Sequence, residues 1–145
     1  MKISSILATK GHEIITIGPE RTLQYVVELL VRHNIGALPV LDENGKLIGI
    51  ISERDVIRHS AIGGTLVDTA VREIMTRKVI VGVPQDDIIS VANTMTEKRF
   101  RHLPIVEGDN LIGIISIGDI LKAQRDTYRG EIDTLETQIM AGDDV

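Results

Sequence analysis

One hexapeptide, Leu-Ile-Gly-Ile-Ile-Ser, occurs twice in this chain, at Leu47–Ser52 and again at Leu111–Ser116. An aspartate follows the serine of each copy by three residues, as Asp55 and Asp119. A Leu-Pro pair precedes each copy, at Leu38-Pro39 and Leu103-Pro104. A six-residue identity in the same context indicates a tandem repeat, so we expect the function to lie in what the two copies form together.

The two copies align over most of their length. With Pro19 opposite Pro84, the offset is 65 residues, and downstream of each proline apolar residues recur at i, i+3, i+4 and i+7. This spacing predicts one amphipathic helix per copy. The apolar positions are Leu23, Val26, Val27 and Leu30 in the first copy, and Ile88, Val91, Ala92 and Met95 in the second.

Two extended runs follow each helix and predict a β-hairpin. In the first copy they are Ala37–Leu41 and Leu47–Ser52, and Asn44-Gly45 between them is a strong hairpin signal because both residue types accept positive φ. The second loop, Glu107-Gly108-Asp109-Asn110, is one residue shorter, which lowers the offset to 64. An insertion confined to a hairpin tip supports the alignment.

The remaining segments complete the predicted unit. Short β runs, Ile14–Ile17 and Val79–Val83, precede the amphipathic helices, and short helical turns, Ile3–Leu7 and Val71–Thr76, precede those runs. A second helix starts near Ser52 and Ser116. The unit is therefore β-α-β-β-α, and we expect an α+β fold with a first repeat at 1–60, a connecting loop at 61–70 and a second repeat at 71–124.

A repeat of about 60 residues buries too little surface to be stable alone. We therefore expect the two repeats to pack through their sheets with approximate two-fold symmetry, which creates two equivalent clefts. The remaining segment, 125–145, is predicted to be a C-terminal helix with a frayed end at Ala141–Val145. Its apolar residues follow a narrow stripe suited to docking on another helix, formed by Tyr128, Ile132, Leu135 and Ile139.

Composition excludes several classes of function. The chain has no cysteine, a net charge of −5 and a pI near 5.3, and only three aromatic residues, so we expect no disulfide or thiolate site and no binding to nucleic acid or anionic membranes. No signal peptide or membrane-spanning run is visible, so we expect an intracellular, cytoplasmic protein. The four histidines lack metal-ligand spacing, and no nucleophile or paired acid and base suggests an enzyme.

The ordered elements closely resemble a pair of CBS domains, also called a Bateman module. In the first repeat these are Ile35–Val40, Leu47–Ser52 and Ser52-Glu53-Arg54-Asp55; Val71–Thr76 leads into the second repeat, which supplies Leu103–Val106, Leu111–Ser116 and Asp119. The resemblance covers about residues 1–124. It implies a regulatory module that binds an adenosine-containing ligand: AMP, ADP, ATP, S-adenosylmethionine or NAD. It also implies a homodimer. Since no other domain is fused here, it implies a stand-alone sensor that regulates another protein in trans.

The resemblance assigns Asp55 and Asp119 to ribose binding, because a carboxylate can accept hydrogen bonds from both hydroxyls of a 2′,3′-diol. The alternative is structural, since Ser-x-x-Asp at a helix start resembles a capping box. Both roles can coexist. Ser52 and Ser116 open the same helices, and the sequence does not separate an N-cap role from a role in placing ribose or phosphate.

The resemblance further implies crossed clefts. One combines Asp55 with Arg54, Arg101, His102 and the strand residues Val79, Ile80 and Val81. The other combines Asp119 with Thr16, Ile35, Gly36 and Ala37, and has Gly118 in the place of Arg54. The Asp55 cleft is therefore expected to be the better phosphate site. The alternative is that Lys98-Arg99 is a solvated helix end and that Arg101 points to water.

The apolar residues of the clefts have two roles that the sequence does not separate. Ile35, Val79 and Ile80 could sandwich adenine or belong to the core, and Thr16 could contact ligand or be an ordinary strand residue. The competing function is a dimerisation or protein-interaction module without ligand. The uncharged Gly36-Ala37 cleft, the net negative charge and the C-terminal stripe are consistent with it.

Overall fold

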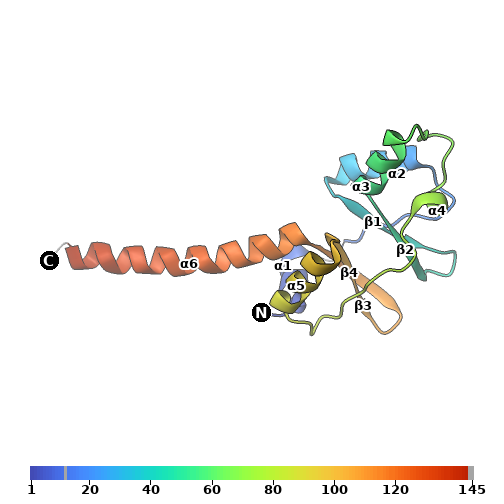
Figure 1. Ribbon diagram of the computed structural model, residues 1–145. Coiled ribbons are helices and arrows are strands. Elements are labelled where there is room, and N and C mark those ends of the chain that lie inside the picture. Colours follow the sequence, from blue (N-terminus) through green and yellow to red (C-terminus); the bar gives the residue numbers. More distant parts are fainter. Residues whose placement is uncertain (12, 144–145) are drawn as a thin grey trace.

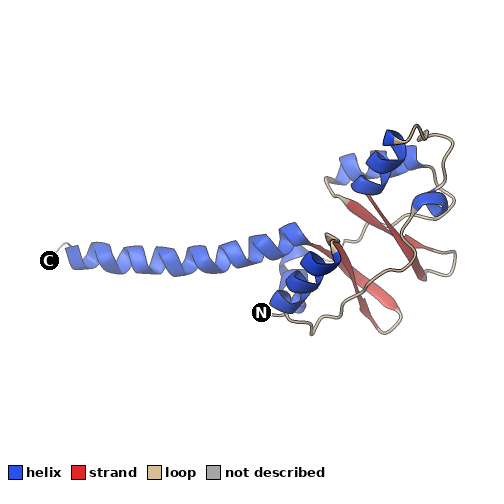
Figure 2. Cartoon of the chain, in the orientation of Figure 1, coloured by secondary structure: helices blue, strands red, loops and turns tan. Residues whose placement is uncertain are grey.

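Two small antiparallel hairpins lie between two groups of helices (Figures 1 and 2). The computed structural model describes residues 1–11 and 13–143, without the side chains of 131, 133, 134 and 137–143. The mixed helix and strand fold predicted from the repeats is confirmed.

The first repeat contains α2 (Leu23–His33), β1 (Ala37–Leu41), β2 (Leu47–Ser52) and α3 (Glu53–Ala61). The second contains α5 (Ile88–Lys98), β3 (His102–Glu107), β4 (Asn110–Ser116) and α6 (Ile117–Asp143). Thr22 and Asp87 cap α2 and α5 by accepting a backbone N–H bond, and both helices end on a left-handed residue, Asn34 at φ 51° and Arg99 at φ 58°. The copies therefore share their helix ends as well as their apolar pattern.

The two hairpins have equivalent registers. Ala37 pairs with Ser52 in the first, His102 pairs with Ser116 in the second, and each register shifts at the equivalent place, after Val40 and after Ile105. The predicted Asn44-Gly45 tip is confirmed: Gly45 has φ 79°, and Asp42 Oδ1 accepts the backbone N–H groups of Asn44 and Lys46 at 2.9 Å.

The predicted first strands, Ile14–Ile17 and Val79–Val83, are wrong as strands, because each forms only one parallel β-bridge, at Ile17 and at Gly82. Ile17 donates to the Pro39 carbonyl and accepts from Leu41 N–H, and Gly82 does the same with Pro104 and Val106. One step further along the ladder, the donor would have to be the nitrogen of Pro39 or Pro104, which carries no hydrogen. The Leu-Pro pairs therefore end the ladder after one bridge.

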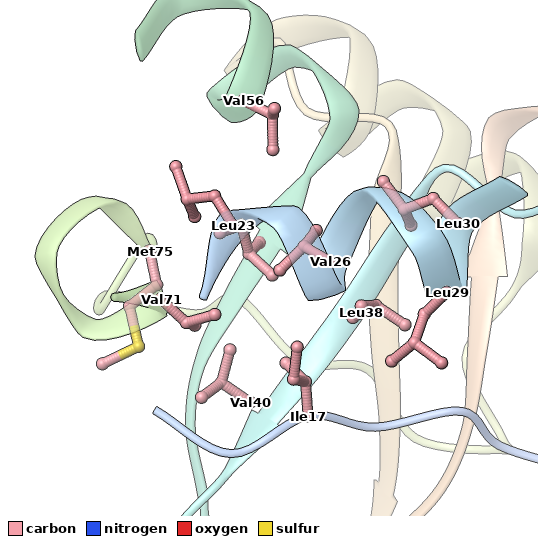
Figure 3. Close-up of a cluster of buried hydrophobic side chains, with 11 residues drawn as sticks. Ile17, Leu23, Val26, Leu29, Leu30, Leu38, Val40, Val56, Val71 and Met75 are labelled. Carbon is pink, nitrogen blue, oxygen red and sulfur yellow. The ribbon is translucent and has the colours of Figure 1, made fainter. Parts of the chain in front are cut away.

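Each core contains the short helix that precedes the other repeat in the sequence. α1 (Ile3–Lys10) precedes the first repeat, yet Ile3 and Ile6 are buried in the second core with Ile88, Val91 and Met95. α4 (Val71–Ile74) precedes the second repeat, yet Val71 and the following Met75 are buried in the first core. Figure 3 shows Val71 and Met75 beside Leu23 at the start of α2.

The glycine of each hexapeptide makes room for the exchanged helix. A Cβ on Gly49 would lie 2.7 Å from Met75 Sδ and 3.0 Å from the Thr76 carbonyl oxygen, and a Cβ on Gly113 would lie 2.6 Å from Leu7 Cδ2. A side chain at Gly49 would therefore meet main chain, and one at Gly113 would meet the end of the Leu7 side chain. The repeated Leu-Ile-Gly-Ile-Ile-Ser is thus a docking surface as well as a strand.

The predicted C-terminal segment is helical, but it is not a separate helix: it continues the last helix of the second repeat as α6, which extends far beyond the rest of the molecule (Figure 1). Of the end predicted to fray, Ala141–Asp143 belong to the helix, and 144–145 lie outside the described residues. None of the helices in the described part of the chain is long and apolar enough to cross a membrane.

Candidate functional site

Asp55 and Asp119 both close a capping box. Ser52 Oγ accepts the Asp55 N–H at 3.3 Å while Asp55 Oδ2 accepts the Ser52 N–H at 2.8 Å, and the corresponding distances for Ser116 and Asp119 are 3.1 and 2.8 Å. The structural role that the Ser-x-x-Asp pattern allows is therefore present in both repeats.

The capping boxes leave half of each carboxylate unused. Every hydrogen bond that Asp55 and Asp119 accept within the described residues goes to Oδ2. Oδ1 keeps its lone pairs for another donor, and both side chains are only partly buried. Each aspartate can therefore hold a helix start and still accept a hydrogen bond from a ligand hydroxyl.

A second set of unused groups lies on the main chain. Within the described residues, no hydrogen bond reaches the backbone N–H or C=O groups of Ile14–Thr16 or of Val79–Val81. Ile17 lies opposite Val40 in a parallel bridge, so Ile14 lies near Ala37, at the end of the hairpin where Ala37 pairs with Ser52. The helix that contains Asp55 begins at the same end. Each repeat thus combines a backbone segment with unpaired N–H and C=O groups and a carboxylate with one unused oxygen. The hydrogen-bonding edge of a purine can pair with such a backbone segment.

The repeats meet where the segments before their hairpins face one another. A Cβ on Gly36 would lie 3.0 Å from His102 Nε2 and 3.3 Å from Glu53 Oε1. Within each repeat the segment before the hairpin is tied to the start of the following helix in the same way, because Glu53 N–H donates to the Gly36 carbonyl and Ile117 N–H to the Arg101 carbonyl, each at 2.9 Å. Gly36 and His102, predicted for different clefts, therefore lie side by side. Glu53, which the sequence did not indicate as a site residue, joins them.

The His102 ring lies among charges from both repeats. Burial lowers the pKa of His102 below its ordinary value of 6.5; Glu53 and Asp119 oppose this, while Lys10 and Arg101 add to it. Asp55, predicted to share a cleft with His102, is not among these groups. The imidazole is therefore held neutral near neutral pH, and an incoming anion would favour its protonated form.

Lys10, at the end of α1, is a site residue that the sequence did not indicate. Its Nζ lies 2.7 Å from Asp119 Oδ2 and donates to the Ile114 carbonyl, also at 2.7 Å. The side chains of Lys10 and Asp119 remain 36 and 25% exposed, so solvent screens the pair. No lysine or arginine in the described residues forms an ion pair with Asp55. A separation of 109 residues leaves no local sequence signal for this contact.

The pKa of Asp119 is lowered from its ordinary value of 3.8. Burial alone would raise it, but the hydrogen bonds from Lys10 and Ser116, together with the charge of Lys10, outweigh burial. Asp119 is therefore ionised throughout the physiological range, as a ribose acceptor requires.

The other predicted residues fall into two groups. Thr16, Ile35 and Arg54 are half-buried, Ala37 is buried, and Arg101 is exposed without an ion pair in the described structure.

Ile80 and Val81 are exposed beside a shallow hollow of ≈ 370 Å³, with half-buried Val79 just before them. That hollow also involves Gly82, Asp86, Ser90, Thr94, Phe100 and Leu103. It contains neither Asp55 nor Arg101, so the structure does not join all members of the predicted Asp55 cleft in one cavity.

Among the side chains that the structure describes, no three histidine, aspartate or glutamate residues are grouped closely enough to hold a metal ion. His12 lies outside that part of the chain. The charges of the site come from Lys10, Glu53, Arg101 and Asp119 around His102.

Comparisons with known proteins agree with this architecture. The sequence profile of the CBS domain matches residues 3–62 and 71–126. CBS domain-containing protein YhcV of Bacillus subtilis is 33% identical over 118 residues, which is 81% of this chain and 84% of that protein. The crystal structure of the CBS-domain containing protein ATU1752 from Agrobacterium tumefaciens has a TM-score of 0.82 at 35% identity, over 85% of this chain and 92% of that one. The CBS domain pair of MJ0100, solved in complex with 5′-methylthioadenosine and S-adenosyl-L-methionine, has a TM-score of 0.79 at 28% identity, over 88 and 98%.

Proposed function

Because this chain belongs to the CBS domain family, we propose that it is a regulatory module that binds an adenine nucleotide in the clefts between its two repeats. The observation that carries the proposal is the combination found in both repeats: a capping aspartate with a free Oδ1, and a backbone edge that the Leu-Pro pair leaves unpaired. Ribose hydroxyls would bind the carboxylates, and the adenine edge would bind the free main chain.

The charges favour a phosphate-bearing ligand. His102 is neutral near neutral pH and would gain a proton beside an anion, and three cations, Lys10, Arg54 and Arg101, lie on segments next to the clefts. A cationic ligand such as S-adenosylmethionine would be repelled by them, whereas the phosphates of AMP, ADP, ATP or NAD would be attracted. We therefore propose a nucleotide for this chain, although the related MJ0100 pair holds two sulfur-containing adenosyl ligands.

We propose the Asp55 cleft as the stronger of the two sites. Lys10 gives the Asp119 cleft a cation that the sequence did not indicate, but it binds the carboxylate on which a ribose would depend. Asp55 has no such competitor in the described residues. A ligand that bridges the repeats would shift their relative arrangement by its difference in affinity for the two arrangements, and that shift would be the regulatory signal to a protein in trans.

Isothermal titration calorimetry at one fixed salt concentration tests the proposal. AMP, ADP, ATP, NAD and S-adenosylmethionine are titrated separately into the full chain. We expect saturable binding of at least one nucleotide, with one strong site per chain, and weaker binding of S-adenosylmethionine. Absence of binding for all five would contradict the proposal and favour a ligand-free interaction module.

A further inference from the structure

The exposed face of α6 is a second feature of the molecule, independent of the clefts. Ile117, Ile120 and Ala123, in its first two turns, pack on the second core. Beyond them the helix leaves the body of the protein, and Figure 2 shows no other element beside its outer part. A helix without tertiary contacts is only marginally stable in water, so the outer part of α6 lacks the packing that stabilises most helices.

The outer part carries an apolar stripe with a seven-residue repeat. Leu121, Tyr128, Ile132 and Leu135 are separated by 7, 4 and 3 residues, and each is 52–60% exposed. A shallow hollow of ≈ 630 Å³ follows this face, lined by Leu121, Gln124, Arg125, Tyr128, Arg129 and Ile132. Alternating spacings of four and three are typical of a helix that packs along another helix.

The charges on α6 are segregated along its axis. The half near the module carries Lys122, Arg125 and Arg129 together with Asp119 and Asp126, whereas the sequence of the outer half is acidic and has no lysine or arginine, and its Glu136 is exposed. Within the described structure, the ion pair of Arg125 is an exposed one of 3.4 Å to its neighbour Asp126. A partner helix that runs in the opposite direction would place acidic residues beside the basic half, and a second copy of α6 has that charge pattern.

The position of Arg125 decides the orientation of the pair. Leu121 and Tyr128 define one set of seam positions, and Arg125, Ile132 and the sequence position of Ile139 define the other. In a parallel pair, two Arg125 side chains would face each other in the seam. In an antiparallel pair centred near residue 130, Tyr128 lies beside Ile132 of the second copy and Arg125 beside Leu135 and Glu136.

We infer that α6 pairs antiparallel with α6 of a second copy of this chain. Arg125 and Glu136 then form two equivalent intermolecular ion pairs, and the two nucleotide-binding modules lie at opposite ends of the paired helices. From Leu121 to Leu135 the seam spans about 21 Å at 1.5 Å per residue. A contact of this length gives a reversible dimer and does not involve the clefts, so it holds whether or not a nucleotide binds.

Sedimentation velocity of the full chain over a range of concentrations tests this inference. We expect reversible, concentration-dependent dimerisation, abolished by Leu135→Lys and retained in Thr127→Lys, an exposed position of α6 off the seam. Arg125→Glu and Glu136→Arg should each weaken the dimer at least tenfold, and the double charge exchange should restore it.

Each other outcome overturns the inference. If the wild-type chain stays monomeric, the apolar stripe of α6 does not bind a second copy of this chain. A dimer that survives Leu135→Lys has its interface elsewhere, and single charge variants that the double exchange does not rescue exclude the antiparallel Arg125–Glu136 contact. Thermal unfolding and circular dichroism show whether each variant keeps the folded module, which the outer part of α6 does not contact.

Discussion

Asp55 and Asp119 occupy equivalent positions, close the same capping box and differ in one neighbour. Lys10 binds Asp119 at 2.7 Å, and no lysine or arginine in the described residues pairs with Asp55. A second difference lies one strand away, where the residues that pair with Ser52 and Ser116 are Ala37 and His102. Equivalent backbones therefore carry unlike charges.

This comparison separates what the duplication keeps from what it changes. Left-handed helix ends, register shifts, capping boxes and the hexapeptide glycines occur in both copies, and all of them determine the path of the main chain. The differences are in side chains that face the junction of the repeats. We therefore expect the two clefts to share a shape and to differ in ligand affinity, and substitutions at equivalent positions test each part of that expectation.

The largest expected effect is on ligand affinity. Asp55→Ala removes the charged acceptor proposed for ribose and should weaken AMP binding roughly tenfold to a hundredfold, because hydrogen bonds to charged groups contribute about 1.5–3 kcal/mol. Asp119→Ala should weaken binding less, because Lys10 already occupies that carboxylate. Calorimetry measures both, and Thr22→Ala is the control that removes a helix cap at a residue assigned to neither cleft. If both aspartate variants bound AMP like the wild type, the assignment of the carboxylates would be wrong.

The hexapeptide glycines provide a second, smaller comparison. Gly49→Ala would meet the carbonyl of Thr76, a residue whose backbone N–H and C=O both bond to Ile50, and should lower the free energy of unfolding by about 1–3 kcal/mol. Gly113→Ala meets only the end of the flexible Leu7 side chain and should cost less than about 1 kcal/mol. Urea unfolding measures both changes. Equal losses would show that Leu7 cannot move aside and that the two docking surfaces are equally rigid.

The smallest expected effect concerns the Lys10 contact. The pKa of Asp119 is lower in the folded chain than when unfolded, so its contribution to stability is complete above the unfolded value of 3.8 and is lost as pH falls through the folded pKa. Lys10→Met should raise the pKa of Asp119, reduce this contribution to the part that Ser116 supplies and cost about 1 kcal/mol or less near neutral pH, since the pair is partly exposed.

Unfolding measured at neutral and acidic pH tests the Lys10 prediction. Lys2→Met is the control at the other end of α1, where the ammonium donates to the uncharged Gln85 at 3.1 Å and forms no ion pair within the described residues. The same acid dependence in Lys10→Met and in the wild type would show that the ion pair does not determine the titration of Asp119.

Local patterns predicted the elements that local forces form. The i, i+3, i+4 spacing before Leu30 and Met95 predicted the helices, and Asn44-Gly45 predicted the hairpin tip, because a turn and an amphipathic face depend on residues close in sequence. The Ser-x-x-Asp spacing likewise indicated a capping box that the structure confirms in both copies. Whether these aspartates also bind ligand stays a prediction.

Features that depend on distant residues could not be predicted in this way. The apolar runs before each helix look like strands, and only the neighbouring Pro39 and Pro104 stop them from pairing further. The Lys10–Asp119 contact joins residues 109 positions apart, and the contact of Glu53 with Gly36 and His102 depends on how the repeats meet. None of these leaves a periodic signal in the sequence.

The exchange of α1 and α4 makes the connection between the repeats part of the folding reaction. Each core lacks one helix until the other repeat supplies it, as domain-swapped dimers lack an element until a second protomer arrives. Here the missing element is covalently attached, so its effective concentration is on the order of millimolar whatever the concentration of the protein. The segment from Ile62 to Ala70 thus turns what would be an association between two chains into a unimolecular step, and dilution cannot separate the two halves of the module.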